Sequence, residues 1–339
     1  MSEKLSRKGF IMSEQTSGGQ LRSEQIQLEK LQSEKIKNEQ PKDFDFGKIS
    51  ITAKVVAFFR TFSDIPFAND VSEIIRAQDA FLQIVNSLDS NASHAFGGEL
   101  PNEGKIYGPL LESRYKSIVE LIRESGCNQV LELASGFSLR GLAMTRDPDY
   151  AYVESDLPDL NNEKHRLVSD IRAKYTLPEF GNHHVVTANA LNLNELEATL
   201  KPFSTDRKLI VVNEGLLMYL SSAERKIVAA NVHQILRKFA GGMWITPDFT
   251  TRQLADNVPE SVKRFRAAIF GATERQLYDS AFDDEDAIEK FFSETGFISD
   301  CRNQLDVVPH LTSVDKLSIS PAIMERLRSR MRVWMLQPS

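Results

Sequence analysis

The sequence predicts an α/β fold with a doubly wound, mostly parallel sheet. After Gly126, five short apolar runs alternate with segments in which apolar residues recur at helical spacing. Short apolar runs between helical segments are typical of parallel strands that helices cover on both faces. The strands are expected at residues 129–134, 150–155, 184–188, 208–213 and 243–246, and the helices at 139–145, 159–175, 193–200 and 221–239.

A helical extension is predicted in front of the sheet, with helices at residues 51–62, 69–88 and 105–125. Asn69 or Asp70 is expected to cap the second helix. Pro109 falls in the first turn of the third helix, where proline is tolerated, and Gly126 is expected to end it.

The pattern is weaker beyond Pro247. Helices are expected at 260–270 and 284–294, and strands at 296–300 and 332–336. The two additional strands bring the predicted sheet to seven. We therefore predict a single domain over residues 46–339, in which 46–127 are the N-terminal helices.

The first 45 residues are predicted to form a flexible polar tail. Glu, Gln, Lys and Ser dominate this segment. Such a composition buries too little apolar surface to offset the entropy of ordering. Leu21, Ile26, Leu28 and Leu31 are spaced to line a short amphipathic helix, so a partner-binding segment is an open alternative.

Composition narrows the class of protein. The chain has 339 residues, of which 41% are hydrophobic and 26% charged, as in ordinary globular proteins. Two cysteines are too few for a disulfide framework, and no apolar run approaches the roughly 18 residues that span a bilayer. The N-terminus lacks the apolar core of a secretory signal, and the net charge of −6 argues against a broad nucleic-acid surface. A cytoplasmic protein without membrane or nucleic-acid partners is expected.

The turn after the first predicted strand is a candidate ligand site, because doubly wound sheets bind ligands at the carboxyl ends of their strands. The small residues Ala134, Ser135 and Gly136 would let the backbone approach a ligand closely, and Gly136 can adopt a positive φ. Ala134 stands where a dinucleotide fingerprint has its first glycine, and no Gly-Lys-Ser/Thr follows. A tight turn without a ligand is the alternative.

Two carboxylates end later strands. Asp156, about twenty residues after the loop, has the position of an acid that accepts both hydroxyls of a ribose, and its alternative role is to cap the next helix. Glu214 ends a strongly apolar strand, where an unpaired buried carboxylate is costly. It should therefore face a cleft, a ligand or a partner, unless it only caps a helix or forms a salt bridge.

Three segments come in the order and spacing of a known family. They read Glu-Leu-Ala-Ser-Gly-Phe-Ser at 132–138, Val-Glu-Ser-Asp-Leu-Pro at 153–158 and Asn-Glu-Gly-Leu-Leu-Met-Tyr-Leu at 213–220. In them the chain resembles the leucine carboxyl methyltransferase-like family, which comprises class I S-adenosylmethionine-dependent methyltransferases and includes polyketide O-methyltransferases. Residues 50–67 and 112–116 resemble the family's N-terminal helix with its following turn and its arginine-bearing helix.

The resemblance implies a Rossmann-like class I methyltransferase sheet, with 128–248 as the cofactor-binding core and 249–339 as the substrate cover and final strands. It implies S-adenosylmethionine as cofactor, bound by Arg114, Glu132, Ala134, Gly136, Asp156, Asn189, Ala190 and Glu214. Arg114 would pair with the methionine carboxylate, Asp156 would hold the ribose, and Asn189 and Ala190 would lie near adenine. Two residues depart from the family pattern: Ala134 replaces a glycine, and Asn189 replaces an aspartate. Lys54, on the N-terminal helix, aligns only loosely with the family, and in that alignment it would reach the cofactor.

The function implied is methyl transfer to a carboxylate or hydroxyl oxygen of a small molecule or peptide. No catalytic base is assigned, and no metal site is predicted because the histidines are scattered. His183 and His184 begin a predicted strand, where one or both should be exposed. An NAD(P)-dependent oxidoreductase and a non-catalytic cofactor-binding module are the alternatives.

Overall fold

The computed structural model describes residues 47–88, 102–179, 181–256, 263–264, 267–268 and 281–339. The chain falls into two units, Met1–Asp45 and Phe46–Ser339, and the described residues belong to the second. The predicted tail and most of the predicted helix at 260–270 lie outside the described residues.

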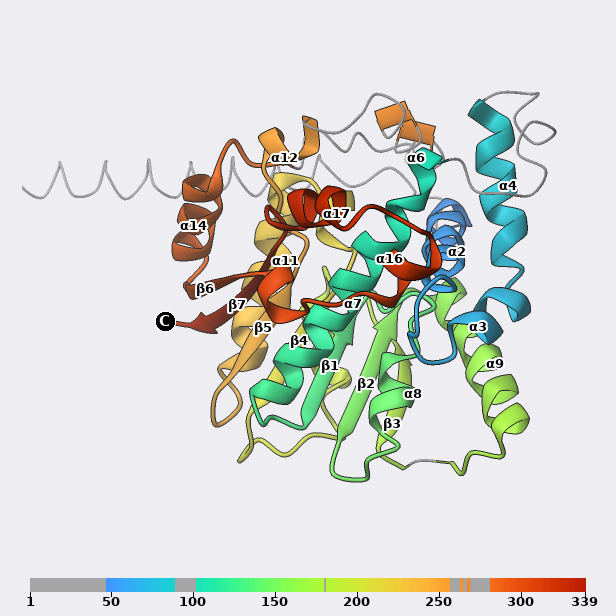
Figure 1. Cartoon of the computed structure of the whole chain (residues 1–339). Coiled ribbons are helices and arrows are strands. Elements are labelled where there is room, and N and C mark those ends of the chain that lie inside the picture. Colours follow the sequence, from blue (N-terminus) through green and yellow to red (C-terminus); the bar gives the residue numbers. More distant parts are fainter. Residues whose placement is uncertain (1–46, 89–101, 180, 257–262, 265–266, 269–280) are drawn as a thin grey trace, which may run out of the picture. The chain divides into compact units, whose positions relative to one another are not determined.

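One seven-stranded sheet organises the second unit, in the order β3-β2-β1-β4-β5-β7-β6 (Figure 1). The strands are β1 Gln129–Leu133, β2 Ala151–Asp156, β3 His183–Thr187, β4 Leu209–Asn213, β5 Gly242–Thr246, β6 Phe297–Asn303 and β7 Arg332–Pro338. The first five strands pair in parallel, and β7 runs antiparallel to both β5 and β6. The predicted doubly wound, mostly parallel sheet is confirmed, with strand ends shifted by up to three residues.

Alternate strand residues pack on opposite faces of this sheet, as the period of two requires. Leu131, Val211 and Trp244 face a core built with α10, α11 and α14, whereas Val130 and Ile210 pack against α7 on the other face. Figure 1 shows α7 crossing in front of the sheet. The helices named here are α7 Tyr107–Glu124, α10 Leu193–Ala198, α11 Ser222–Leu236 and α14 Glu285–Glu294.

The remaining helices border the sheet or cover its carboxyl edge. They are α2 Gly47–Arg60, α3 Ala68–Ile74, α4 Ala77–Leu88, α6 Asn102–Lys105, α8 Arg140–Met144, α9 Pro158–Tyr175, α12 Arg252–Asp256, α15 Gln304–Val307, α16 Thr312–Lys316, α17 Pro321–Arg328 and the 3-10 turn η1 Leu217–Tyr219. Six of these elements were not predicted: α6, α12, η1 and the three helices between β6 and β7. Each of them has at most eight residues, about two helical turns, over which a periodic pattern is weak.

The N-terminal helices differ from the prediction in one place. The segment expected as one helix is divided into α3 and α4, and Arg76 between them has a φ of 54°. The predicted caps are wrong: Phe67 occupies the N-cap of α3 without a side-chain bond. Asp70 instead accepts from the Tyr175 hydroxyl at 2.8 Å and pairs with Lys174 at 2.6 Å, so its carboxylate is engaged by α9.

The order of the strands fixes where a ligand site can form. The chain passes from β1 outward to β3 and then returns to β4 on the other side of β1. The connections after β1 and β4 therefore leave the sheet in opposite directions. Such a switch point opens a crevice at the carboxyl ends of the strands.

Candidate functional site

The loop after β1 has an unusual backbone. Gly136 has a φ of 55°, a conformation that the sequence allows for a glycine there, and Ala134 has a φ of 50°. The left-handed region favours glycine, so a glycine would adopt the conformation of Ala134 without strain. The loop also turns tightly, since the Ser138 amide donates to the Ser135 carbonyl at 3.0 Å.

Asp156 lies directly beside this loop. One carboxylate oxygen accepts the Gly136 N–H at 2.7 Å, and the other accepts the Leu157 N–H at 2.8 Å. The N-cap position of α9 is Leu157, so Asp156 precedes the cap instead of occupying it. Burial raises the pKa of Asp156, although the two N–H donors act in the opposite direction. Each oxygen keeps an acceptor site beyond the one N–H that it binds.

Glu214 lies among three guanidinium groups. Its carboxylate is 3.0 Å from Arg60 and 2.6 Å from Arg140, and Arg114 Nε lies 4.0 Å away. The Glu214 side chain is 5% exposed. Burial alone would raise the pKa of Glu214, but the three cations outweigh it and hold that pKa below its ordinary value. The salt-bridge alternative for Glu214 is therefore present.

Arg114 reaches from α7 to the end of β5. Its Nη2 lies 2.6 Å from Asp248 Oδ1, and its Nε is buried without a hydrogen-bond partner among the described residues. The Asp248 carboxylate also accepts the N–H groups of Gly215, Leu216 and Leu217 at 2.7–3.0 Å. Asp248 thus holds both Arg114 and the loop after β4.

Glu132 has protein partners on both carboxylate oxygens. Arg140 binds one of them, and the Tyr152 hydroxyl donates to the other at 2.7 Å. Glu132 is 1% exposed and Arg140 is fully buried. Arg140 in turn lies with its guanidinium 4.4 Å from the centre of the Tyr115 ring. Glu132 therefore fixes Arg140, which carries the contact onward to Glu214.

Asn189 and Ala190 follow β3 at the same edge of the sheet. The preceding Ala188 N–H donates to the Asp156 carbonyl at 3.0 Å, which ties this segment to the end of β2. The Asn189 side chain accepts the Leu191 N–H at 3.0 Å. No contact within the described part of the chain joins the Asn189 side chain to the three arginines around Glu214. The predicted site residues therefore form two groups at the carboxyl ends of the strands, one around Glu214 and one around Asp156.

The sequence also raised expectations for Lys54 and for the pair His183 and His184. Lys54, on α2, pairs with Glu163 at 3.4 Å and lies 6.0 Å from the centre of the Phe137 ring, next to the loop after β1. His183 is buried, and its Nε2 is 3.0 Å from Glu154, a buried carboxylate that needs partners inside the sheet. His184 is half-buried, so the expected exposure of this pair is wrong.

Three charged residues of the site were not predicted from the sequence: Arg60, Arg140 and Asp248. Arg60 is the last residue of α2, and Arg140 is the first residue of α8, after the candidate loop. Asp248 follows β5 by two residues. Asp248 could have been predicted as a site residue, because it follows the carboxyl end of a strand and the site was expected there.

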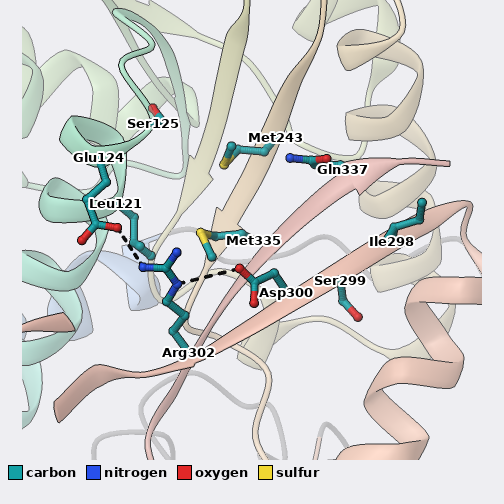
Figure 2. Close-up of a pocket in the computed structure, with 10 residues that line it drawn as sticks. All are labelled: Leu121, Glu124, Ser125, Met243, Ile298, Ser299, Asp300, Arg302, Met335 and Gln337. Atoms are coloured by element: carbon teal, nitrogen blue, oxygen red, sulfur yellow. Dashed lines mark hydrogen bonds and ion pairs between the residues drawn. The ribbon is translucent and has the colours of Figure 1, made fainter. Parts of the chain in front are cut away.

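A cavity of about 320 Å³ lies elsewhere in the molecule (Figure 2). Its lining includes Leu121 and Glu124 near the end of α7, Met243 near the start of β5, and Arg302 of β6. Met243 lies at the amino end of β5, whereas Asp248 follows the carboxyl end of the same strand. This cavity therefore lies at the opposite end of β5 from the candidate site. None of the predicted site residues lines it.

The described residues contain neither a metal cluster nor a membrane-spanning helix. No group of three or more His, Cys, Asp or Glu side chains among them is placed to hold a metal ion. No helix in the same part of the chain is long and apolar enough to cross a membrane.

The geometry fits S-adenosylmethionine. Asp156 is a carboxylate at the end of β2 with acceptor capacity for ribose hydroxyls. The buried Nε of Arg114, which lacks a hydrogen-bond partner among the described residues, belongs to a guanidinium suited to a carboxylate. A Cβ added at Gly136 would meet only Ala53 within 4 Å, at 3.9 Å, so a ligand can come close to the backbone at this point.

Comparison with known proteins gives a family match over part of the chain. Residues 111–233 match the family model described as leucine carboxyl methyltransferase. No curated protein matches the chain.

Solved structures resemble the chain at low identity. They include a putative O-methyltransferase from Nostoc punctiforme PCC 73102, with 14% identity over 79% of this chain and 73% of that one and a TM-score of 0.46. A putative methyltransferase from Thermobifida fusca YX has 15% identity over 76% of this chain and 93% of that one, with a TM-score of 0.46. A DUF574 family protein from Streptomyces avermitilis MA-4680 has 14% identity over 85% of this chain and 96% of that one, with a TM-score of 0.48.

The matched segment contains Arg114 of α7, the loop after β1, Asp156 and Glu214, whereas residues 50–67, which also resemble the family, precede it. The expected resemblance to the leucine carboxyl methyltransferase family is therefore confirmed over residues 111–233, about a third of the chain.

Proposed function

We propose that this methyltransferase transfers the methyl group of S-adenosylmethionine to a carboxylate oxygen of a small molecule or peptide. A sulfonium methyl is already electrophilic, so the protein mainly has to hold the acceptor in line and exclude water. A carboxylate acceptor is anionic at neutral pH and needs no general base, whereas a hydroxyl acceptor needs its proton removed.

The observation that carries this choice is the ionic state of the groups near the end of β4. Glu214 is buried among Arg60, Arg140 and Arg114, whose charges lower its pKa and make it a weak base. Burial raises the pKa of Tyr219, so its phenol stays protonated at neutral pH. Neither group is suited to take a proton from a hydroxyl acceptor.

The cofactor roles proposed for the site come from the family resemblance, and the geometry of the site supports them. Arg114 would bind the methionine carboxylate, and Asp156 would accept the ribose hydroxyls. The backbone at Ala134 and Gly136 would border the methionine part of the cofactor.

The other predicted residues are assigned to adenine, to the side of the cofactor or to an indirect role. Asn189 and Ala190 would lie beside adenine, at the end of β3. Glu214 would stand beside the cofactor, and Glu132 would act indirectly, because its partner Arg140 also binds Glu214.

Transfer from radiolabelled S-adenosylmethionine tests the acceptor class. The purified protein is incubated with a panel of carboxylic acids and a matched panel of alcohols and phenols, and products are treated with alkali. Methyl esters hydrolyse and release volatile labelled methanol, whereas methyl ethers do not. Label that becomes volatile supports the proposal, and stable label in the alcohol panel would replace it with hydroxyl methylation.

Calorimetry with S-adenosylhomocysteine tests the site itself. Arg114→Ala and Asp156→Ala should each weaken binding about tenfold or more, since hydrogen bonds to charged groups contribute about 1.5–3 kcal/mol. Lys174→Ala, a change at an exposed position on α9, is the control and should leave the affinity unchanged. Tight NADH binding without any binding of S-adenosylhomocysteine would favour the oxidoreductase alternative.

A further inference from the structure

Lys164 is a buried cation on the apolar side of α9. It lies in register with Leu160, Leu167 and Ile171, which face the core, and it is fully buried. Taking an ammonium group out of water costs several kcal/mol unless its partners compensate. The partners of Lys164 therefore indicate what the residue is for.

Two groups bind the Lys164 ammonium. Glu154 Oε2 lies 3.2 Å from Nζ, and the Ser135 hydroxyl accepts a hydrogen bond from Nζ at 2.7 Å. Glu154 is also bound by His183 at 3.0 Å and by the Gly141 N–H at 3.0 Å. Glu154 balances the charge of Lys164, so charge balance alone does not require the contact with Ser135.

Ser135 is the middle residue of the candidate cofactor loop. It stands between Ala134 and Gly136, both of which have a positive φ. Its own N–H donates to the Ser155 carbonyl at 3.0 Å, and its hydroxyl is held by Lys164. The bond from Lys164 is thus a side-chain tie from α9 to a loop whose backbone is in a sparsely populated conformation.

We propose that Lys164 is a positioning residue for the cofactor, which fixes the loop after β1 through the Ser135 hydroxyl and so sets the affinity for S-adenosylmethionine. The proposal rests on the proposed cofactor site. Lys164 acts through the loop and not by touching the reacting atoms. Its charge also lies close enough to Asp156 to oppose the effect of burial on the pKa of that carboxyl group.

A double-mutant cycle on cofactor affinity tests this role. Lys164→Met and Ser135→Ala should each weaken S-adenosylhomocysteine binding about five- to tenfold by calorimetry, and the double variant should be no weaker than the worse single variant. Effects that multiply in the double variant, or a Ser135→Ala variant with unchanged affinity, would overturn the proposal. Ser135→Thr keeps the acceptor hydroxyl and should restore binding to within about twofold.

Stability is separated from positioning by a control on the same helix. Val168→Ala removes buried apolar contacts from α9 and should lower the melting temperature without changing the affinity. If Lys164→Met does not fold, Ser135→Ala against Ser135→Thr still decides the question.

The outcome for the proposed cofactor site is distinguishable from the outcome for Lys164. Absence of S-adenosylhomocysteine binding by the unaltered protein would refute the cofactor site. Loss of binding in Asp156→Ala together with full binding in Ser135→Ala would refute only the role of Lys164.

Discussion

The Asp248 carboxylate lies 2.6 Å from Arg114 Nη2 and at the same time accepts the N–H groups of Gly215, Leu216 and Leu217. One buried side chain therefore joins the proposed anchor of the cofactor carboxylate to the loop after β4. A change in the position of Arg114 would therefore shift that loop through Asp248, and a movement of the loop would shift Arg114.

Asp248→Asn should weaken both folding and cofactor binding. The amide keeps the size of the side chain but removes the charge that pairs with Arg114, and it presents a donor where backbone N–H groups need an acceptor. We expect a loss of about 2–4 kcal/mol in the free energy of unfolding, measured with urea. We also expect about tenfold weaker binding of S-adenosylhomocysteine by calorimetry.

Asp283→Asn is the matched control for this change. It breaks an exposed pair with Arg252, and exposed pairs contribute about 0–1 kcal/mol. Equal effects of the two substitutions would contradict the role given to Asp248.

Ala134→Gly should stabilise the protein. Alanine at a φ of 50° is strained by about 1–2 kcal/mol, and the greater freedom of glycine in the unfolded chain offsets part of the gain. A net increase of about 0.5–1 kcal/mol in the free energy of unfolding is expected. Ala230→Gly, at an exposed position inside α11, should instead destabilise by about 1 kcal/mol. The same sign for both variants would show that the loop carries no strain of this kind.

Gly141→Ala tests how closely α8 packs on β2. A Cβ at this position would lie 2.8 Å from Tyr152 Cδ1 and 2.9 Å from the Glu154 carboxyl carbon, and both side chains are buried. Overpacking of this kind costs about 1–3 kcal/mol, so a lower midpoint of urea unfolding is expected. Gly181→Ala meets no atom within 4 Å and should leave the midpoint nearly unchanged. A Gly141→Ala variant as stable as Gly181→Ala would contradict the close packing.

The centre of the sheet could be predicted from the sequence because β1 and β4 are short apolar runs, and such runs record burial on both faces. Asp156 and Glu214 could be found because they end such runs. Lys164 and Arg140 could not, since a buried charge is explained only by partners distant in sequence, such as Ser135 and Glu214. The pairing of Arg114 with Asp248 was missing for the same reason: 134 residues separate the two.

The N-terminal helices show a second kind of limit. The segment containing α3 and α4 has helical periodicity throughout, yet the chain breaks at Arg76, whose φ is positive. Periodicity reports which residues are buried but does not report a single residue that leaves the helical region. Asp70 likewise has a capping side chain by type, and only its contacts with α9 explain why it does not cap.

Glu154 should make the protein sensitive to acid. Burial alone would raise its pKa, but Lys164 and His183 outweigh burial and lower the pKa to about 2 from an ordinary value of 4.5. A carboxyl group whose pKa is lowered by folding contributes stability above its unfolded pKa, and this contribution is lost as the pH falls through the folded value. The loss is therefore expected between about pH 4.5 and pH 2, and it should amount to about 3 kcal/mol.

Urea unfolding at pH 7, 4.5 and 3 measures this contribution. Glu154→Gln should be less stable than the unaltered protein at pH 7, because Lys164 loses its counter-charge. The difference should shrink at pH 3, because protonation of the carboxyl group in the unfolded chain removes much of its advantage. Glu73→Gln, at an exposed position on α3, removes one carboxylate without a buried partner and serves as the control. A difference between Glu154→Gln and the unaltered protein that stays constant from pH 7 to pH 3 would mean that Glu154 does not hold its charge through the buried pair with Lys164.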